Sequence, residues 1–305
     1  MNWISGKRHL CIVAIVLSAI AQGQSPEGAA QSAQKSTSVP FFVNNPHDRP
    51  VSTVGKNDIR VIDEKYQAKV LTLAKGTEIP LRLVLLLDAS NSESVSTLYQ
   101  PALKAAWNLM SQVLVGPDDK VAIVKFSSKP ESPTQFLQRT ELQNYKLDVR
   151  FGGASALQDA VRFACESRMD TDNTKPYRRV IILLSDGDDN SSQSTKEEAI
   201  AAALGTGTVL FVVSTREHQL GWDSNKRSAG ILRDLAEKTG GKAFLDLGLG
   251  NLDQSFSKIT EQIQNMYVVT FDAPVHNHNG FHSIGLELVS PGKARVRVPQ
   301  GYYAK

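Results

Sequence analysis

Residues 83–92, Leu-Val-Leu-Leu-Leu-Asp-Ala-Ser-Asn-Ser, give the clearest indication of both fold and function. The five apolar residues Leu83–Leu87 are typical of a strand that is buried on both faces of a parallel sheet. Asp88, Ser90 and Ser92 follow at alternating positions, so an extended chain, or one beginning to turn into a helix, can bring their oxygens to one point. Hard cations prefer such oxygen ligands. The stretch therefore predicts a cation site at the end of a buried strand.

The sequence after this stretch alternates apolar runs with segments of helical periodicity. Strands are expected at Leu83–Leu87, Lys120–Phe126, Arg179–Leu184, Val209–Val213 and Lys242–Leu245. Helices are expected at about Val95–Leu114, Leu157–Ser167, Lys196–Leu204, Ala229–Thr239 and Asn251–Asn265. Continuously apolar strands separated by helices indicate an α/β fold, a doubly wound and mostly parallel sheet with helices on both faces.

The segments on either side of this region are expected to form a small antiparallel β extension. Within residues 46–80, apolar positions on both sides of a polar turn predict two short strands, at Ile59, Val61, Ala68, Val70 and Leu71. Residues 266–305 alternate apolar and polar positions in three runs, Tyr267–Phe271, Ile284–Val289 and Ala294–Pro299. His276–Gly280 is expected to be the turn between the first two. We expect the strands of both segments to pair.

The first 21 residues have the pattern of a signal peptide. Lys7 and Arg8, with His9, precede an apolar run, and Ala19-Ile20-Ala21 offers a small-residue cleavage site. Retention as a membrane anchor is the alternative, although the run is short for a bilayer span. Residues 22–45, rich in Gln, Ser, Ala, Gly and Pro, are expected to be a disordered linker. The protein is therefore expected to be exported, to the periplasm, the cell surface or the medium.

Charge and cysteine content narrow the functional classes. The formal net charge is +3, and removal of the signal leaves +1. A nearly neutral chain gives no reason to expect nucleic acid or an anionic membrane as partner. Cys11 lies in the signal, so only Cys165 remains and no internal disulfide is expected. Cys165 lies among apolar helix positions, which favours a buried, inert thiol over a nucleophile.

Three loops of the predicted sheet offer oxygen ligands. Functional residues of open parallel sheets gather in the loops at the carboxyl ends of the strands. The first loop holds Asp88, Ser90 and Ser92, the second is the glycine-rich segment with Ser155, and the third begins Ser185-Asp186-Gly187. Ser and Asp are also common as helix caps and turn residues. The three loops in this order nevertheless favour a shared cation site.

These motifs resemble a von Willebrand factor A-type domain with a metal-ion-dependent adhesion site. The pattern of that family is Asp-x-Ser-x-Ser, then a Thr after a Gly-Gly loop, then an Asp-Gly after a later strand. It falls on five residues within 81–265, namely Asp88, Ser90, Ser92, Ser155 and Asp186. The flanking β segments and the ending Gly301-Tyr-Tyr further resemble a bacterial exported subgroup.

This sequence departs from the family pattern at three positions. Ser155 stands where the family usually has Thr, which keeps the hydroxyl and loses a methyl that restricts the rotamer. Asn91 and Glu93 replace the usual Gly and Met. Glu93 adds a carboxylate beside the site, and the sequence leaves open whether it raises the affinity for a cation or competes with an acidic ligand.

The resemblance implies a non-catalytic binding or adhesion module. It implies that Mg²⁺, with Mn²⁺ or Ca²⁺ as alternatives, leaves one coordination position for an Asp or Glu of a protein partner. No oligomeric state is assigned. One alternative is a Mg²⁺-dependent phosphohydrolase with Asp88 as nucleophile, but Ser90 stands where such enzymes need an acidic residue. The other is a scaffold with a vestigial metal site.

Two further clusters have simpler explanations than metal binding. Asp188, Asp189 and Asn190 suggest a second cation site, but a solvated acidic turn is favoured. Three histidines suggest zinc, but a polar hairpin tip is favoured for His276, His278 and His282.

Overall fold

The computed structural model describes residues 36–169, 176–216, 222–273, 280–290 and 292–303. All of them belong to a single unit that spans residues 34–305. The predicted signal peptide, residues 1–21, lies outside the described residues, as do His276 and His278.

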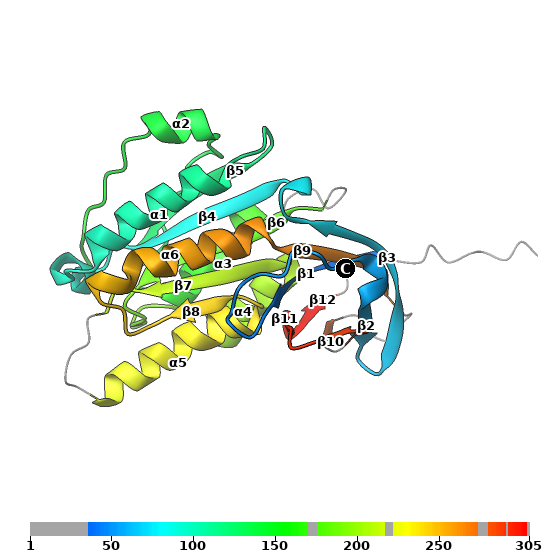
Figure 1. Ribbon diagram of the computed structural model, residues 1–305. Coiled ribbons are helices and arrows are strands. Elements are labelled where there is room, and N and C mark those ends of the chain that lie inside the picture. Colours follow the sequence, from blue (N-terminus) through cyan, green and yellow to red (C-terminus); the bar gives the residue numbers. More distant parts are fainter. Residues whose placement is uncertain (1–35, 170–175, 217–221, 274–279, 291, 304–305) are drawn as a thin grey trace, which may run out of the picture. The chain divides into compact units, whose positions relative to one another are not determined.

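A five-stranded parallel sheet forms the centre of this unit (Figure 1). Its strand order is β5-β4-β6-β7-β8. The strands are β4 (Leu81–Asp88), β5 (Lys120–Phe126), β6 (Arg178–Ser185), β7 (Thr208–Ser214) and β8 (Lys242–Phe244). Every residue of β6 and β7 is buried, as their continuously apolar sequences predict. The predicted parallel sheet is thus confirmed.

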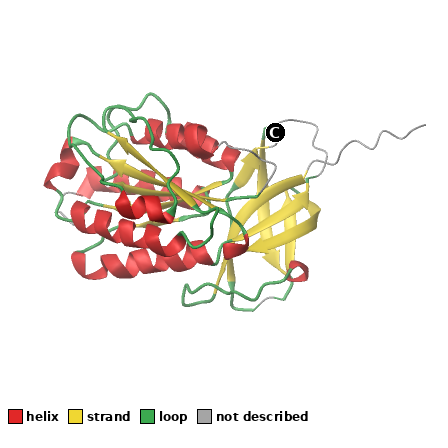
Figure 2. Ribbon diagram, turned by 90° about the horizontal axis from the view of Figure 1, so that it is seen from above, coloured by secondary structure: helices red, strands yellow, loops and turns green. Residues whose placement is uncertain are grey.

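Helices cover both faces of the parallel sheet (Figure 2). Leu83, Leu85 and Leu87 of β4 pack in one core cluster, together with residues from α1 (Tyr99–Val113), α2 (Arg139–Asn144) and α6 (Leu249–Gln264). Val84 and Leu86 point to the other face, into a cluster with α3 (Leu157–Ala164), α4 (Lys196–Thr206) and α5 (Trp222–Lys238). Successive side chains of a strand point to opposite faces, so one apolar run serves both cores.

Short helical segments modify two of the predicted helices. The first helix, expected from about Val95, begins only at Tyr99 as α1, and residues Asn91–Val95 before it form η3, a 3₁₀ helix. The helix predicted to run to Ser167 changes from α to π geometry in η4 (Cys165–Met169). η3 therefore belongs to the loop with the predicted cation ligands rather than to α1.

The flanking segments form a seven-stranded antiparallel sheet. Its order is β11-β1-β9-β3-β2-β10-β12. The strands are β1 (Ser36–Asn44), β2 (Ile59–Asp63), β3 (Tyr66–Lys75), β9 (Tyr267–Asp272), β10 (Phe281–Leu288), β11 (Arg295–Arg297) and β12 (Gly301–Tyr303). Since β9 pairs with β1 and β3, and β10 with β2, both ends of the chain build this sheet, as predicted.

The predicted linker over residues 22–45 is wrong for residues 36–44. These residues form β1, which pairs with β9 on one side and β11 on the other. Val39, Phe41 and Val43 are buried in the core of the antiparallel sheet, and Phe41 stacks on Tyr267 at 5.2 Å between ring centroids. The short apolar run within this mostly polar segment forms a strand because it pairs with β9 and β11, which come from the other end of the chain.

The hairpin predicted around residues 276–280 is also wrong. β9 and β10 follow one another in sequence, but β3 and β2 lie between them in the sheet. Both edges of β9 are already taken by β1 and β3, so β10 pairs with β2 and β12 instead.

None of the helices within the described ranges has the length and apolarity that a membrane crossing requires.

Candidate metal centre

The predicted site lies at the carboxyl ends of two neighbouring strands. Asp88 is the last residue of β4, and Asp186 follows directly after β6. The two strands are paired in register, with Leu87 opposite Leu184. The topology therefore brings together two carboxylates that are almost a hundred positions apart in the sequence.

Asp88 is fully buried and held by hydrogen bonds on both carboxylate oxygens. Its Oδ1 accepts from the backbone N–H of Ser90 at 3.0 Å. Its Oδ2 accepts from the hydroxyls of Ser185 at 2.7 Å and Ser155 at 3.1 Å. Burial raises the pKa of Asp88 to about 6, although these hydrogen bonds act in the opposite direction.

Backbone contacts between the first and second loops bring the serines together. The N–H of Asn91 donates to the carbonyl of Gly153, and the N–H of Gly152 donates to the carbonyl of Ala89. Gly153 has φ of 78°, where a Cβ would lie 2.6 Å from the hydroxyl oxygen of Ser128. Glycine is therefore required at this position.

The third loop fixes Ser155 from the other side. The backbone N–H of Ser155 donates to Oδ1 of Asn190 at 2.9 Å, and its carbonyl accepts from the N–H groups of Asn190 and Ser191. In the first loop, the hydroxyl oxygens of Ser90 and Ser92 lie 3.2 Å apart. Hydrogen-bond contacts thus join Asp88, Ser90, Ser92 and Ser155, and a carboxylate oxygen of Asp186 lies within 4.8 Å of one of Asp88. Their binding of a metal stays a prediction.

The acidic turn of the third loop makes specific protein contacts. Asp189 accepts hydrogen bonds from the N–H of Gln158 at the start of α3 and from the hydroxyl of Ser192. Asp188 pairs with Arg216 and accepts from the hydroxyl of Ser228. These contacts tie the acidic turn to the start of α3 and to Arg216.

Glu93 is a further member of the centre, and the sequence did not fix its place there. It is only 1% exposed, and its Oε1 accepts from the N–H of Asp186 at 2.8 Å and the hydroxyl of Thr215 at 2.6 Å. Its Oε2 is buried and has no hydrogen-bond partner among the described residues. Burial, with the charges of Asp88 and Asp186, raises the pKa of Glu93 to about 8. In a 3₁₀ helix residues i and i+3 are eclipsed, so η3 brings Glu93 to the same side as Ser90.

The donor set fits a hard divalent cation. One carboxylate oxygen from each of Asp88, Glu93 and Asp186 lies within 4.8 Å of the other two. Three buried carboxylates repel one another, and a cation relieves this repulsion. Nη2 of Arg216 lies 3.6 Å from Oδ2 of Asp186, but the same guanidinium also pairs with Asp188. The positive charge of Arg216 therefore compensates only part of the negative charge.

His282 and Cys165, for which the sequence favoured roles other than metal binding or catalysis, lie elsewhere in the structure. His282 is buried, stacks on Tyr302 and has its Nδ1 3.3 Å from Oε1 of Glu64, so within the described ranges it is not part of a metal-ligand cluster. Cys165 is fully buried, which raises its thiol pKa to about 12. The expected buried thiol is thus confirmed.

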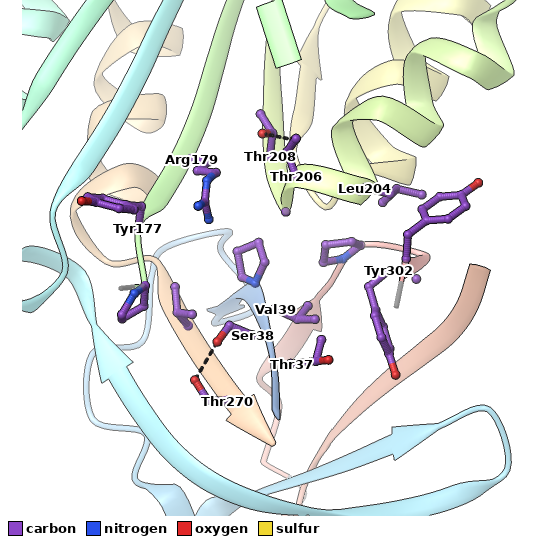
Figure 3. Close-up of a pocket in the computed structure, with 18 of the residues that line it drawn as sticks. Thr37, Ser38, Val39, Tyr177, Arg179, Leu204, Thr206, Thr208, Thr270 and Tyr302 are labelled. Carbon is purple, nitrogen blue, oxygen red and sulfur yellow. Dashed lines mark hydrogen bonds between the residues drawn. The ribbon is translucent and has the colours of Figure 1, made fainter. Parts of the chain in front are cut away.

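A cavity of about 590 Å³ lies at the opposite edge of the parallel sheet (Figure 3). It is lined by residues at the start of β6 and β7, including Arg179 and Thr208, and by residues of β1 and β9. Two pairs of its hydroxyls bond to each other, Ser38 with Thr270 and Thr206 with Thr208. Its described lining holds no carboxylate, so it lacks the ligands of the candidate metal centre.

Comparison with known proteins gives one family and several distant structures. The profile of the von Willebrand factor type A domain matches residues 83–266. No curated protein matches the chain. A von Willebrand factor type A structure from Catenulispora acidiphila is 14% identical, covers 87% of this chain and 72% of its own, and has a TM-score of 0.49. The pilus adhesin SpaC of Lactobacillus rhamnosus GG is 11% identical, and the match covers 82% of this chain and 48% of SpaC with a TM-score of 0.49. The PilB minor pilin of Streptococcus sanguinis is 14% identical, and the match covers 61% of each chain with a TM-score of 0.43.

Proposed function

Because the chain belongs to the von Willebrand factor type A domain family, we propose that it is a non-catalytic binding module. In this proposal a divalent cation, held by Asp88, Ser90, Ser92, Ser155 and Asp186, captures an acidic side chain of a protein partner. The observation that carries the proposal is the convergence of these five side chains from three separate loops.

The chemistry of the donors supports Mg²⁺ as the cation. Carboxylates and hydroxyls are hard oxygen ligands, and Mn²⁺ and Ca²⁺ accept the same set. Asp88 and Glu93 are buried whereas Ser92 is exposed, so the centre opens to solvent on the side of Ser92. A bound cation would supply a positive charge on that open side, where a carboxylate of a partner can approach.

The residue two positions after Asp88 argues against a phosphohydrolase. Ser90, two residues further on, has no acidic proton to give to a leaving group.

We also propose that residues 1–21 export the protein, so that its partner lies in the periplasm, on the cell surface or outside the cell. The basic residues Lys7 and Arg8 and the following apolar run support this part of the proposal.

A pull-down from the native envelope fraction tests partner capture. We expect the wild-type protein to retain a partner with Mg²⁺ and to release it with EDTA, and we expect Asp88→Ala to retain nothing. As a matched control, the same envelope proteins are treated with carbodiimide and ethanolamine, which block Asp and Glu carboxylates. Retention of the blocked proteins would contradict capture through an acidic side chain.

Two simpler measurements test the alternatives. Calorimetry showing that Mg²⁺, Mn²⁺ and Ca²⁺ all fail to bind would favour a scaffold with a vestigial site. Mg²⁺-dependent hydrolysis of p-nitrophenyl phosphate that is lost in Asp88→Ala would favour the phosphohydrolase.

A further inference from the structure

We propose that Glu93 is a third carboxylate ligand of the cation, which strengthens cation binding and weakens the capture of an acidic ligand. The inference rests on the proposed function for the presence of a cation in the centre, but not for the identity of a partner.

The position of the Glu93 carboxylate is fixed by two different loops. Its Oε1 accepts from the N–H of Asp186, after β6, and from the hydroxyl of Thr215, after β7. The carbonyl of Thr215 in turn accepts from the hydroxyl of Ser96, just beyond η3. Glu93 is therefore anchored through one oxygen, and the other oxygen remains available.

That second oxygen is the independent indication of a ligand. Oε2 of Glu93 is buried, and no described group donates a hydrogen bond to it. A buried carboxylate oxygen that has no hydrogen-bond partner is energetically unfavourable. A cation beside Asp88 and Asp186, whose oxygens lie within 4.8 Å of a Glu93 oxygen, would satisfy it.

Burial decides between the two roles that the sequence left open for Glu93. A competitor for the open coordination position has to reach the cation from the solvent side, near the exposed Ser92. Glu93 is 1% exposed and is held against the ends of β6 and β7. It therefore approaches the cation from the interior and leaves the open side free.

The added charge affects the two binding steps in opposite directions. With Asp88 and Asp186 alone, a divalent cation makes a neutral centre. With Glu93 as a third carboxylate the centre carries a net charge of −1. More ligand charge strengthens cation binding. The same charge reduces the attraction for an incoming carboxylate.

Calorimetry on Glu93→Gln tests both directions with defined probes. We expect the Kd for Mg²⁺ to rise by about tenfold or more relative to wild type. With saturating Mg²⁺, we expect acetate to bind Glu93→Gln more tightly than wild type. Asp148→Asn is the control, because it removes the same charge from an exposed carboxylate that pairs with Arg150 outside the cluster. Its Kd for Mg²⁺ should change by less than about threefold.

Direct coordination has a separate measurement. Water-proton relaxation of bound Mn²⁺ counts the water molecules on the ion, and Glu93→Ala should add one. Circular dichroism should show that both Glu93 variants are folded.

The possible outcomes separate the two proposals. If the wild-type protein binds Mg²⁺ and Glu93→Gln binds it within twofold, Glu93 is not a ligand, while the proposed function stands. If the wild-type protein binds no divalent cation, both proposals fail.

Discussion

The two ends of the parallel sheet both bury charged side chains, but they do so in opposite ways. At the amino end, Arg178 is 1% exposed, with Nη2 at 3.5 Å from Oδ1 of the buried Asp119. The guanidinium also donates to the carbonyls of Ile79 and Ile263. Asp119 accepts from three backbone N–H groups, those of Leu81, Val115 and Gly116. The charges of Arg178 and Asp119 therefore balance each other, and both groups have hydrogen-bond partners.

The carboxyl end instead gathers three buried carboxylates, whose negative charge Arg216 compensates only in part. Asp88, Glu93 and Asp186 meet there, and one oxygen of Glu93 has no described partner. Burial raises the pKa of Asp88 to about 6 and that of Glu93 to about 8. One end therefore has the properties of a structural ion pair, and the other has those of a binding site.

The largest effect is expected at the amino end. Arg178→Met should lower the free energy of unfolding by about 3–5 kcal/mol, because it leaves the Asp119 charge buried without its partner. Urea unfolding measures this change. Arg150→Met is the matched control, since it removes the exposed pair with Asp148 and should cost less than about 1 kcal/mol. Equal losses in the two variants would remove the distinction between the buried and exposed pairs.

The buried carboxylates at the carboxyl end should make the cation-free protein less stable as the pH rises. Glu93 has an ordinary pKa of 4.5, and its native pKa is about 8, so between these values the native state holds more protons than the unfolded state. Stability then falls with rising pH, by at most about 1.4 kcal/mol per pH unit for this group. Urea unfolding in EDTA between pH 5 and pH 8 measures the slope.

Mg²⁺ should reverse this pH dependence, because a cation binds the ionised carboxylates and competes with protons. A flat profile in EDTA would mean that the buried carboxylates do not hold protons in the native state. A decline that persists in Mg²⁺ would mean that the cation does not bind them.

Asp88→Ala should abolish stabilisation by Mg²⁺ without unfolding the protein. At a concentration of about 100 times its Kd, a ligand stabilises the native state by about 2.7 kcal/mol, which thermal unfolding detects. The variant should lose this shift and keep its circular dichroism spectrum, because Asp88 lies at the end of the sheet. Asp148→Ala, which changes an exposed carboxylate, should keep the full shift. If Asp88→Ala does not fold, Asp88 is needed for the structure, as Arg178 is, and the prediction is wrong.

Ser155→Thr should have the smallest effect. Threonine keeps the hydroxyl that donates to Asp88 and restricts its rotamer, so the affinity for Mg²⁺ should stay within about threefold or increase. Calorimetry measures this affinity. A large loss of binding would mean that the hydroxyl of residue 155 has been wrongly assigned to the centre.

The sequence predicted the parallel sheet well because each strand carries its own signal. Five apolar runs mark β4 to β8, and parallel order follows from the helices between them. The same order placed the loops of Asp88 and Asp186 at one edge, so the meeting of the five site residues could be foreseen.

The errors lie where a distant partner decides the structure. β1 is ordered by β9 and β11 from the other end of the chain, and β10 pairs with β2 instead of its sequence neighbour β9. The place of Glu93 depends on η3 and on donors from Asp186 and Thr215. None of these long-range contacts is visible in a local sequence pattern.

Crystals grown with Mn²⁺ provide the most direct test of the metal centre, because anomalous diffraction locates the ion. We expect one peak at the ends of β4 and β6, within about 2.5 Å of a hydroxyl oxygen of Ser90 or Ser92 and of an oxygen of Glu93. Absence of a peak there at a Mn²⁺ concentration that saturates known sites of this chemistry would contradict the account.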